Sequence, residues 1–416
     1  MILFFVNNPI NILAITYWSY RDALIQTATL PHLWIIQRRL PPGSKIYLVT
    51  LEKKDLGFLS IERNQVKLDL SARGIEWISF HYAPFGWNAF LIWTGALFSL
   101  GYCIFRNKIN FIHCWGTPAG VVGYLLSILS GRKLVIDSYE PHAEAMVENG
   151  TWAKSGLAFR LLFWFEKIQT RHAHSIIATT EGVRQYAKLK YGLDINRFFV
   201  KPACVDLQLF SEKNIKNPEL LERYGFVNKI VCVYAGKFGG IYLEHEVFDF
   251  LKVATTHWGD SFRVLLLSNH PPDAIREYCA RTGMDPAILT QIFVKHADIP
   301  DYLGLGDFAI TPVKPVPTKQ YCTPIKDGEY WALGLPVVIP ANISDDSRII
   351  FENDCGAVLD GLDTKAYEKA VDQISLLISK PRAERFNKIR ALAKKFRSFD
   401  IAERVYREVY PAMPQD

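Results

Sequence analysis

The sequence lacks the cysteine spacing that metal sites and disulfide frameworks require. Its 416 residues contain seven cysteines, an odd number scattered from Cys103 to Cys355 without a Cys-x-x-Cys pair or a Cys/His cluster. Such cysteines are typical of buried thiols that act as small hydrophobic side chains in a reducing compartment. The start, Met1–Val6, also lacks the basic segment of a signal peptide and predicts a first strand. We therefore expect a cytoplasmic protein with no metal and no bound cofactor.

The sequence also lacks the dense basic clusters of a nucleic-acid-binding protein. It has 48 lysines and arginines against 42 aspartates and glutamates, a formal net charge of +6. This mild excess argues against nucleic acid as a partner. A weakly basic surface suits anionic substrates or an anionic membrane face, and an ordinary solvated surface explains it equally well.

Charge is absent from one long stretch, Ala83–Phe105, which is rich in large apolar side chains. The stretch is long enough to span a bilayer, but a proline and several glycines interrupt it, and strand-like segments lie on both sides. A buried or half-buried helix fits these features best. An interfacial helix that contacts a membrane is the alternative, and a membrane span fits worst.

Short apolar runs alternate with longer helical patterns along the whole chain, which is typical of parallel sheets whose strands are joined by helices. The first series predicts strands at Ile2–Val6, Lys45–Thr50, Glu76–Phe80, Asn110–Cys114, Lys133–Asp137 and Ser175–Ala178. The second predicts strands at Ile230–Ala235, Arg263–Ser268, Ile292–Val294, Phe308–Thr311, Val337–Ile339 and Ala357–Leu359. The fold class is therefore α/β, with two Rossmann-like, doubly wound domains in which ligands bind beyond the carboxyl ends of the strands.

The two series meet near the segment Lys201–Asp206. We predict an N-terminal domain at residues 1–203 and a second domain at residues 204–395. Residues 396–416 follow the last predicted strand and form a final helix that is expected to pack back on the first domain. A chain of this length suits two domains of about 200 residues each.

The most informative motif is the segment Cys322–Val338. Pro324 precedes a predicted helix that carries Lys326 in its first turn and Glu329 three residues later on the same face. Gly334 ends this helix and a strand follows. Because amides at a helix N-terminus bind anions and Lys326 adds a positive charge, the segment predicts a phosphate site. A surface Lys–Glu pair is the simpler alternative.

This segment resembles the nucleotide-sugar block of glycosyltransferase family 4, retaining enzymes with the GT-B fold, in which two Rossmann-like domains face each other across a cleft. The matching pattern is Pro-x-Lys-x-x-Glu-Tyr-x-Ala-x-Gly-x-Pro-Val. The resemblance implies that Glu329 holds hydroxyls of the nucleotide ribose or donor sugar. It also implies that the loop of Thr323, Pro324 and Ile325 meets the diphosphate. Tyr321 stands where many members have a second Glu near the donor sugar.

A second motif is the strand end Val233–Gly240. Gly236 lets the backbone approach a phosphate closely, and Lys237 supplies positive charge. The motif resembles the Gly-Arg/Lys element after the first strand of the family's nucleotide domain, although the usual second Lys several residues later is absent. A plain glycine-rich turn is the alternative.

Between these two motifs, Val294–Tyr302 resembles the segment that holds the nucleotide base through its backbone. The resemblance implies that Val294, Lys295 and Ile299 contact the base. Backbone contacts of this kind do not identify which base is bound.

In the first domain, His113 lies at the carboxyl end of a predicted strand. Family members carry a His there that faces the donor sugar and the reacting centre, so the resemblance implies a catalytic role. A buried structural histidine is the alternative. The next strand end, Asp137–Glu144, gathers carboxylates and an imidazole and is either acceptor-binding or structural. Near the N-terminus, Tyr17 and Trp18 suit stacking against a sugar or packing in the core.

Taken with the resemblance, these motifs imply a retaining, metal-independent glycosyltransferase of polysaccharide biosynthesis, with a nucleotide-sugar donor and a glycan or glycolipid acceptor. Lys237 and Lys326 would stabilise the leaving diphosphate, while His113 and Glu329 would act at the donor sugar. The stretch 83–105 would give peripheral contact with the cytoplasmic face of a membrane. A sugar-nucleotide epimerase shares the two-domain plan and is one alternative. A non-catalytic nucleotide-sugar binder or partner subunit is another, favoured by Tyr321.

Overall fold

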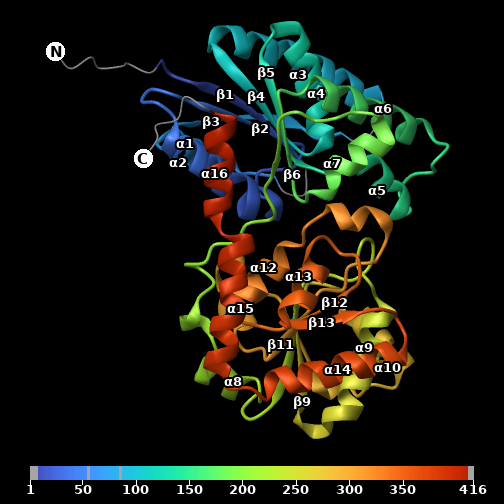
Figure 1. Ribbon diagram of the computed structural model, residues 1–416. Coiled ribbons are helices and arrows are strands. Elements are labelled where there is room, and N and C mark those ends of the chain that lie inside the picture. Colours follow the sequence, from blue (N-terminus) through green and yellow to red (C-terminus); the bar gives the residue numbers. More distant parts are fainter. Residues whose placement is uncertain (1–7, 54–56, 84–86, 411–416) are drawn as a thin grey trace. The chain divides into compact units, whose positions relative to one another are not determined.

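The computed structural model describes residues 8–53, 57–83 and 87–410 (Figure 1). The strand predicted at Ile2–Val6 lies outside these residues, as do residues 84–86 of the apolar stretch. The first described strand is β1 (Asn11–Ile15), which the sequence analysis did not predict.

The chain forms two compact units. Unit 1 comprises Met1–Val147, Thr151–Lys201 and Asp400–Asp416, and unit 2 comprises Glu148–Gly150 and Pro202–Phe399. The chain passes into unit 2 between Lys201 and Pro202, inside the segment where the two strand series meet. It returns to unit 1 at Asp400, so the described residues 400–410, which follow unit 2 in the sequence, belong to the first unit.

Unit 1 is built on a parallel sheet of seven strands. After β1 these are β2 (Ile46–Glu52), β3 (Ile75–His81), β4 (Ile109–Trp115), β5 (Lys133–Tyr139), β6 (Ser175–Ala178) and β7 (Phe198–Val200). Their order in the sheet is β3-β2-β1-β4-β5-β6-β7. The order reverses between β1 and β4, and the carboxyl ends beside such a reversal are where doubly wound sheets bind ligands.

Helices cover both faces of this sheet (Figure 1). One face carries α1 (Leu30–Arg39), α2 (Ser60–Ser71) and α16 (Phe399–Val409), and the other carries α3 (Trp87–Arg106), α4 (Thr117–Ser130) and α6 (Leu157–His172). Two shorter helices are α5 (His142–Glu148) and α7 (Gly182–Tyr186). A π-helical turn, Ala187–Tyr191, continues α7, and Gly192 ends it with φ of +68°.

Unit 2 is built on a parallel sheet of six strands. They are β8 (Ile230–Ala235), β9 (Phe262–Leu267), β10 (Leu289–Ile292), β11 (Phe308–Ile310), β12 (Val337–Pro340) and β13 (Gly356–Leu359). Their order is β10-β9-β8-β11-β12-β13, with the reversal between β8 and β11. The strand predicted at Ile292–Val294 shares only Ile292 with β10, and Ile292 is the last residue of β10.

The helices of unit 2 lie on both faces of its sheet (Figure 1). They are α8 (Pro218–Arg223), α9 (His245–Trp258), α10 (Pro272–Thr282), α11 (Ile299–Leu303), α12 (Ile325–Ala332), α13 (Asp346–Asn353), α14 (Thr364–Ile378) and α15 (Arg382–Arg397). Alternate residues of β8 enter two different apolar clusters, Val231 and Val233 on one face and Cys232 and Tyr234 on the other. Such two-sided burial explains why β8 is a continuous apolar run in the sequence.

The apolar stretch of unit 1 forms α3, a surface helix. Ala96, Leu100 and Ile104 are buried, while Phe98 and Phe105 point outward and are exposed. Across residues 8–53, 57–83 and 87–410, none of the helices combines the length and apolar character needed to cross a membrane.

Candidate nucleotide-sugar site

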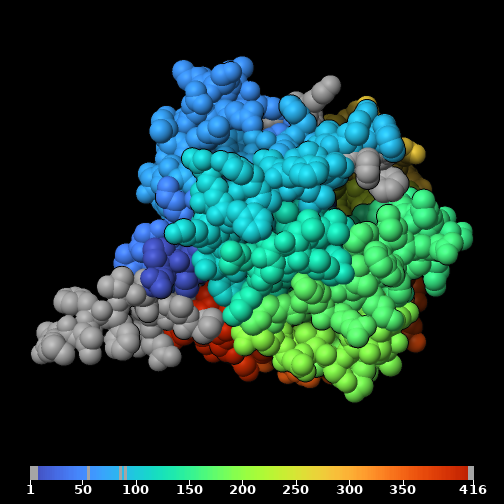
Figure 2. Space-filling model, turned by 90° about the horizontal axis from the view of Figure 1, so that it is seen from above, coloured from blue at the N-terminus to red at the C-terminus, as the bar shows by residue number. Residues whose placement is uncertain are grey.

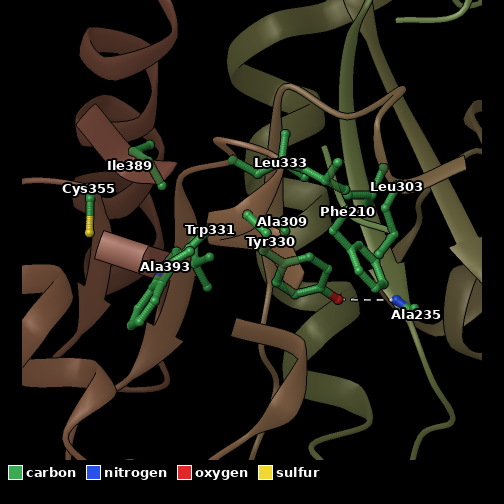
Figure 3. Packing of buried hydrophobic residues seen from close by; sticks show 14 of the residues in the cluster. Phe210, Ala235, Leu303, Ala309, Tyr330, Trp331, Leu333, Cys355, Ile389 and Ala393 are labelled. Carbon is green, nitrogen blue, oxygen red and sulfur yellow. Dashed lines mark hydrogen bonds between the residues drawn. The ribbon is translucent and has the colours of Figure 1, made fainter. Parts of the chain in front are cut away.

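Helix α12 starts immediately after Pro324, as the sequence predicted, and it is tied to the end of β8. The backbone amide of Ala235, the last residue of β8, donates a hydrogen bond of 3.2 Å to the Tyr330 hydroxyl (Figure 3). Tyr330 and Trp331 are fully buried in the apolar cluster that surrounds this contact. The cluster therefore holds α12 in place beside the strand.

The first turn of α12 is also tied to β11, the strand on the other side of the reversal. The Thr311 hydroxyl, directly after β11, donates a short hydrogen bond to Oδ1 of Asp327. Both side chains are buried. The start of α12 thus lies at the carboxyl ends of β8 and β11, where doubly wound sheets bind ligands.

The glycine-rich turn and the first turn of α12 are in direct contact. A Cβ atom built on Gly236 would lie 3.1 Å from Cε of Lys326 and 2.7 Å from the Tyr234 hydroxyl. Gly236 also has a φ of +154°, a conformation that side-chain-bearing residues rarely adopt. The two motifs predicted to bind phosphate therefore meet in space, although about 90 residues separate them in the chain.

The two lysines of these motifs differ in environment. Lys237 is exposed, and its carbonyl oxygen accepts a hydrogen bond of 2.7 Å from the Tyr234 hydroxyl. Lys326 is half-buried, with Nζ 5.2 Å from the centroid of the Tyr242 ring. Tyr242 thus holds the Lys326 ammonium over its face while Lys237 remains accessible to a ligand.

Glu329 lies one turn further along α12 and is only 8% exposed. Burial raises the pKa of Glu329 to about 7, the Lys326 ammonium opposes this rise, and Asp327 adds to it. Burial likewise raises the pKa of Asp327 to about 6, against the Thr311 hydrogen bond and the charge of Arg397. A buried carboxyl group that titrates near neutrality is characteristic of functional sites.

The residues assigned to the base lie at the edge of the same cluster. Val294 and Ile299 are half-buried and pack against the cluster that contains Ala235 and Tyr330. Lys295 is exposed in the loop between them.

The loop before α12 carries the remaining predicted residues. Tyr321 ends a 3₁₀ turn, Pro317–Tyr321, and is half-buried. Thr323 is buried, and its hydroxyl lies 3.1 Å from that of Ser344. Pro324 and Ile325 are half-buried at the start of α12.

In unit 1, His113 is part of a buried polar network. Its Nδ1 lies 2.5 Å from the Tyr410 hydroxyl, and its Nε2 lies 3.2 Å from Oδ2 of Asp137. The side chain is fully buried, and burial lowers its pKa. A neutral His113 would donate from Nε2 to Asp137 and accept from Tyr410 at Nδ1. These contacts support the structural alternative for His113, while its catalytic role stays a prediction.

Asp137 is the centre of this network. It accepts a hydrogen bond of 2.7 Å from the Tyr406 hydroxyl, and its Oδ1 lies 3.1 Å from Nζ of Lys201. Burial alone would raise the pKa of Asp137, but the Lys201 ammonium and the His113 hydrogen bond outweigh burial and lower it. The network joins strands β4 and β5, which carry His113 and Asp137, to helix α16, which carries Tyr406. Nothing in the sequence pattern indicated it.

A second group of predicted residues gathers at the carboxyl ends of β1, β4 and β5. The Tyr17 and Trp18 rings are stacked at an angle, with centroids 4.3 Å apart, and both lie beside Gly116. His142 approaches Tyr17 edge-on at 6.3 Å, and its Nδ1 lies 3.3 Å from a carboxylate oxygen of Glu140. Aromatic faces beside hydrogen-bonding groups suit the binding of a sugar ring.

Among the residues that the structure describes, no group of three or more His, Cys, Asp or Glu side chains is arranged to hold a metal ion. The seven cysteines all lie among the described residues and form no disulfide; Cys322 is half-buried and the other six are buried.

Comparison with known proteins identifies the fold of this chain but not its family. No family model matches the chain, and no curated protein matches it. It is similar to HepE from Anabaena, crystallised with UDP, at 15% identity over 97% of this chain and 100% of that chain, with a TM-score of 0.71. It is also similar to sucrose-phosphate synthase from Thermosynechococcus elongatus, at 14% identity over 97% of this chain and 100% of that chain, with a TM-score of 0.69. A protein named as a UDP-N-acetylglucosamine 2-epimerase from Listeria monocytogenes is similar at 14% identity over 96% of this chain and 96% of that chain, with a TM-score of 0.61. The predicted fold class, GT-B with two Rossmann-like units, is confirmed.

Proposed function

We propose that the chain is a retaining glycosyltransferase that moves a sugar from a nucleotide-sugar to a carbohydrate or lipid-linked acceptor. The contact between Gly236 and Lys326 at the strand-order reversal of unit 2, one turn from Glu329, carries this proposal. The contact brings together a glycine whose backbone a ligand can approach closely, the positive charge of Lys326 and, one turn away, the buried hydrogen-bond acceptor Glu329. The likeness to HepE, whose structures include complexes with UDP and with UDP-glucose, supports the same ligand class.

In this proposal, Lys237, Lys326 and the amides at the start of α12 meet the diphosphate. Negative charge grows on the diphosphate as the glycosidic bond breaks, so positive groups stabilise the transition state more than the ground state. These groups take the place of a metal ion. Thr323 and Ile325 contribute amides, whereas Pro324 has no amide hydrogen and fixes the start of the helix.

Glu329 accepts hydrogen bonds from hydroxyls of the ribose or donor sugar, and Tyr321 lies on the donor-sugar side. The backbone of Val294, Lys295 and Ile299 holds the base. Tyr17 and Trp18 form the acceptor platform of unit 1. We further propose a role in polysaccharide biosynthesis, in the cytoplasm, with peripheral attachment to the membrane through residues 83–105.

A thermal-shift screen of nucleotide-sugars tests the proposal, because a ligand that binds only the folded chain raises its melting temperature. We expect a shift with one donor class, followed by transfer from that donor to an acceptor. Absence of a shift with every nucleotide-sugar would contradict both binding and transfer. Turnover of the donor without any acceptor would favour an epimerase, the alternative supported by the likeness to the Listeria protein. Binding without turnover against a broad acceptor panel would favour a non-catalytic binder.

A further inference from the structure

The buried side chains of helix α6 are polar, and large apolar side chains are exposed on its outer side. Glu166, Gln169 and Thr170 are buried, whereas Leu161 and Trp164 are 41% and 53% exposed. A helix on the surface of a globular protein normally has the opposite arrangement. Glu166 is satisfied in its buried position, because it accepts hydrogen bonds from the Ala143 amide and the Tyr191 hydroxyl. The outer face of α6 is therefore adapted to something other than water.

The neighbouring helices continue this outer apolar face. On α3, the exposed residues Leu91, Phe98, Tyr102 and Phe105 recur at spacings of seven, four and three, which places them on one side of the helix. On α4, which packs against both α3 and α6, Ile128 and Leu129 are exposed. Figure 2 shows the three helices side by side across one face of unit 1, from cyan through teal to green. We call the outer side of α3, α4 and α6 the three-helix face. Single exposed apolar residues are ordinary, but a connected group of this kind marks an interaction surface.

The charges on this face have one sign. The sequence contains no aspartate or glutamate from residue 77 to residue 136, a span that includes α3 and α4. Its charged residues are Arg106, the last residue of α3, and Lys108, Arg132 and Lys133, which follow shortly after α3 and α4 in the chain. On α6, Arg160, Lys167 and Arg171 are exposed, whereas the one acidic residue, Glu166, is buried. Arg160, Trp164, Lys167 and Arg171 follow one another at helical spacing, so basic and aromatic side chains share the outer side.

From these features we infer that the three-helix face docks onto an anionic lipid bilayer. Aromatic and aliphatic side chains enter the boundary between headgroups and acyl chains, and the basic side chains meet anionic headgroups. A symmetric contact between two copies of the chain would place the same basic residues opposite one another, which disfavours self-association. The inference extends the membrane attachment proposed above from the stretch 83–105 to a surface in which α6 is an equal contributor, and it does not depend on transferase activity.

Vesicle flotation of the full chain tests this inference. Vesicles are made of phosphatidylcholine alone or mixed with phosphatidylglycerol, each at low and high salt. We expect binding to the mixed vesicles that weakens as salt screens the charges. Two double variants remove outward apolar groups, Phe98→Ser with Phe105→Ser on α3 and Leu161→Ser with Trp164→Ser on α6. Each should lower the partition coefficient by roughly ten-fold or more, because large apolar groups no longer enter the bilayer.

A third double variant, Arg160→Glu with Lys167→Glu, tests the charges of α6. It should lower binding by at least roughly five-fold per position and remove most of the salt dependence. The matched control is Phe351→Ser on α13 of unit 2, a side chain that is 77% exposed, and it should bind vesicles like the wild type. Melting temperature and nucleotide binding, measured on each variant, show that the variants are folded.

Three results would overturn the inference. The first is a wild-type chain that does not float with the anionic vesicles. The second is an α6 variant that binds as well as the wild type, since α3 alone would then be responsible. The third is a dimer in solution that the α3 and α6 variants convert to a monomer, which would make a second copy the occupant. Nucleotide binding without vesicle binding contradicts this inference and the membrane attachment proposed above but not the transferase activity, and vesicle binding without nucleotide binding contradicts only the transferase activity.

Discussion

The Lys326 side chain lies so close to Gly236 that a Cβ at position 236 would be 3.1 Å from its Cε. Gly236→Ala must therefore displace Lys326 or the Tyr234 hydroxyl, and we expect nucleoside diphosphate affinity to fall by roughly ten-fold, as for one charge-assisted hydrogen bond. Calorimetric titration measures this. Gly283→Ala is the matched control, since Gly283 also has a positive φ but faces open space. Equal affinity of the two variants would contradict the proposed site.

The lysines and Glu329 should respond differently to salt. Lys237→Ala and Lys326→Ala each remove a positive charge that we place on the diphosphate, so each should weaken its binding by roughly 1.5–3 kcal/mol at low salt. The loss should shrink at high salt, where screening already weakens the contact. Glu329 accepts hydrogen bonds from neutral hydroxyls in this proposal. Glu329→Gln should therefore be milder than Glu329→Ala, and neither effect should depend on salt.

Nucleoside diphosphate affinity of these four variants at two salt concentrations is the decisive measurement. Tighter binding by Glu329→Ala, with unchanged binding by both lysine variants, would place the site elsewhere in the chain.

The raised pKa of Glu329 makes stability depend on pH. The folded carboxyl has a pKa of about 7, above its ordinary value of 4.5, because burial disfavours its charged form. As pH rises from about 4.5 to about 7, the unfolded chain ionises first, so the free energy of unfolding falls. Glu329→Gln cannot ionise and should be more stable than the wild type by about 3 kcal/mol above pH 7 and nearly equal to it near pH 4.5.

Chemical unfolding across this pH range checks the prediction. The exposed Glu368, replaced by Gln, is the control, and its curve should run parallel to that of the wild type. A Glu329→Gln curve that also runs parallel would mean that the pKa of Glu329 in the folded chain is close to its ordinary value.

His113 has two predicted roles that one experiment separates. His113→Ala removes one of the buried partners of Asp137, and it removes the contact of the Tyr410 hydroxyl with Nδ1. We therefore expect a loss of about 1–3 kcal/mol in stability and an unchanged rate per folded molecule. Tyr410→Phe, which removes only the hydroxyl, should give a smaller loss of the same kind. The catalytic role implied by the resemblance instead requires a rate loss of about two orders of magnitude with stability retained.

Transfer should survive excess EDTA, because lysines and amides take the place of a metal ion at the diphosphate in the proposed mechanism. The measurement is the initial rate with and without chelator, followed by addition of manganese. A rate that EDTA abolishes and manganese restores would reject the metal-independent mechanism.

The sequence predicted the fold well because buried parallel strands leave continuous apolar runs. The runs Ser175–Ala178 and Ile230–Ala235 coincide with β6 and β8. It missed β7, three residues long, because so short a run cannot be told from a loop. It placed β10 too late, because Ile292–Val294 is more apolar than the strand residues Leu289–Ile292 themselves.

The site was predictable only where its residues are neighbours in the chain. The helix carrying Lys326 and Glu329 follows from local spacing, and α12 begins where Pro324 predicted. The network around His113 does not follow from local spacing, because Tyr410 lies 297 positions from His113 and no periodicity links these two residues. The outward apolar face of α6 was equally hidden, since an apolar stripe in a sequence does not reveal which side faces the core.

The return of the chain to unit 1 at Asp400 has a consequence for synthesis on the ribosome. Asp137 and His113 are made before unit 2, but their partners Tyr406 and Tyr410 are added only after all of unit 2. Unit 1 therefore stays unfinished while all of unit 2 is translated, and unit 2 is the first of the two whose residues are complete. Until residue 406 is made, the Asp137 carboxylate has His113 and Lys201 as partners but lacks the Tyr406 hydroxyl, and the incomplete first unit is open to capture by chaperones.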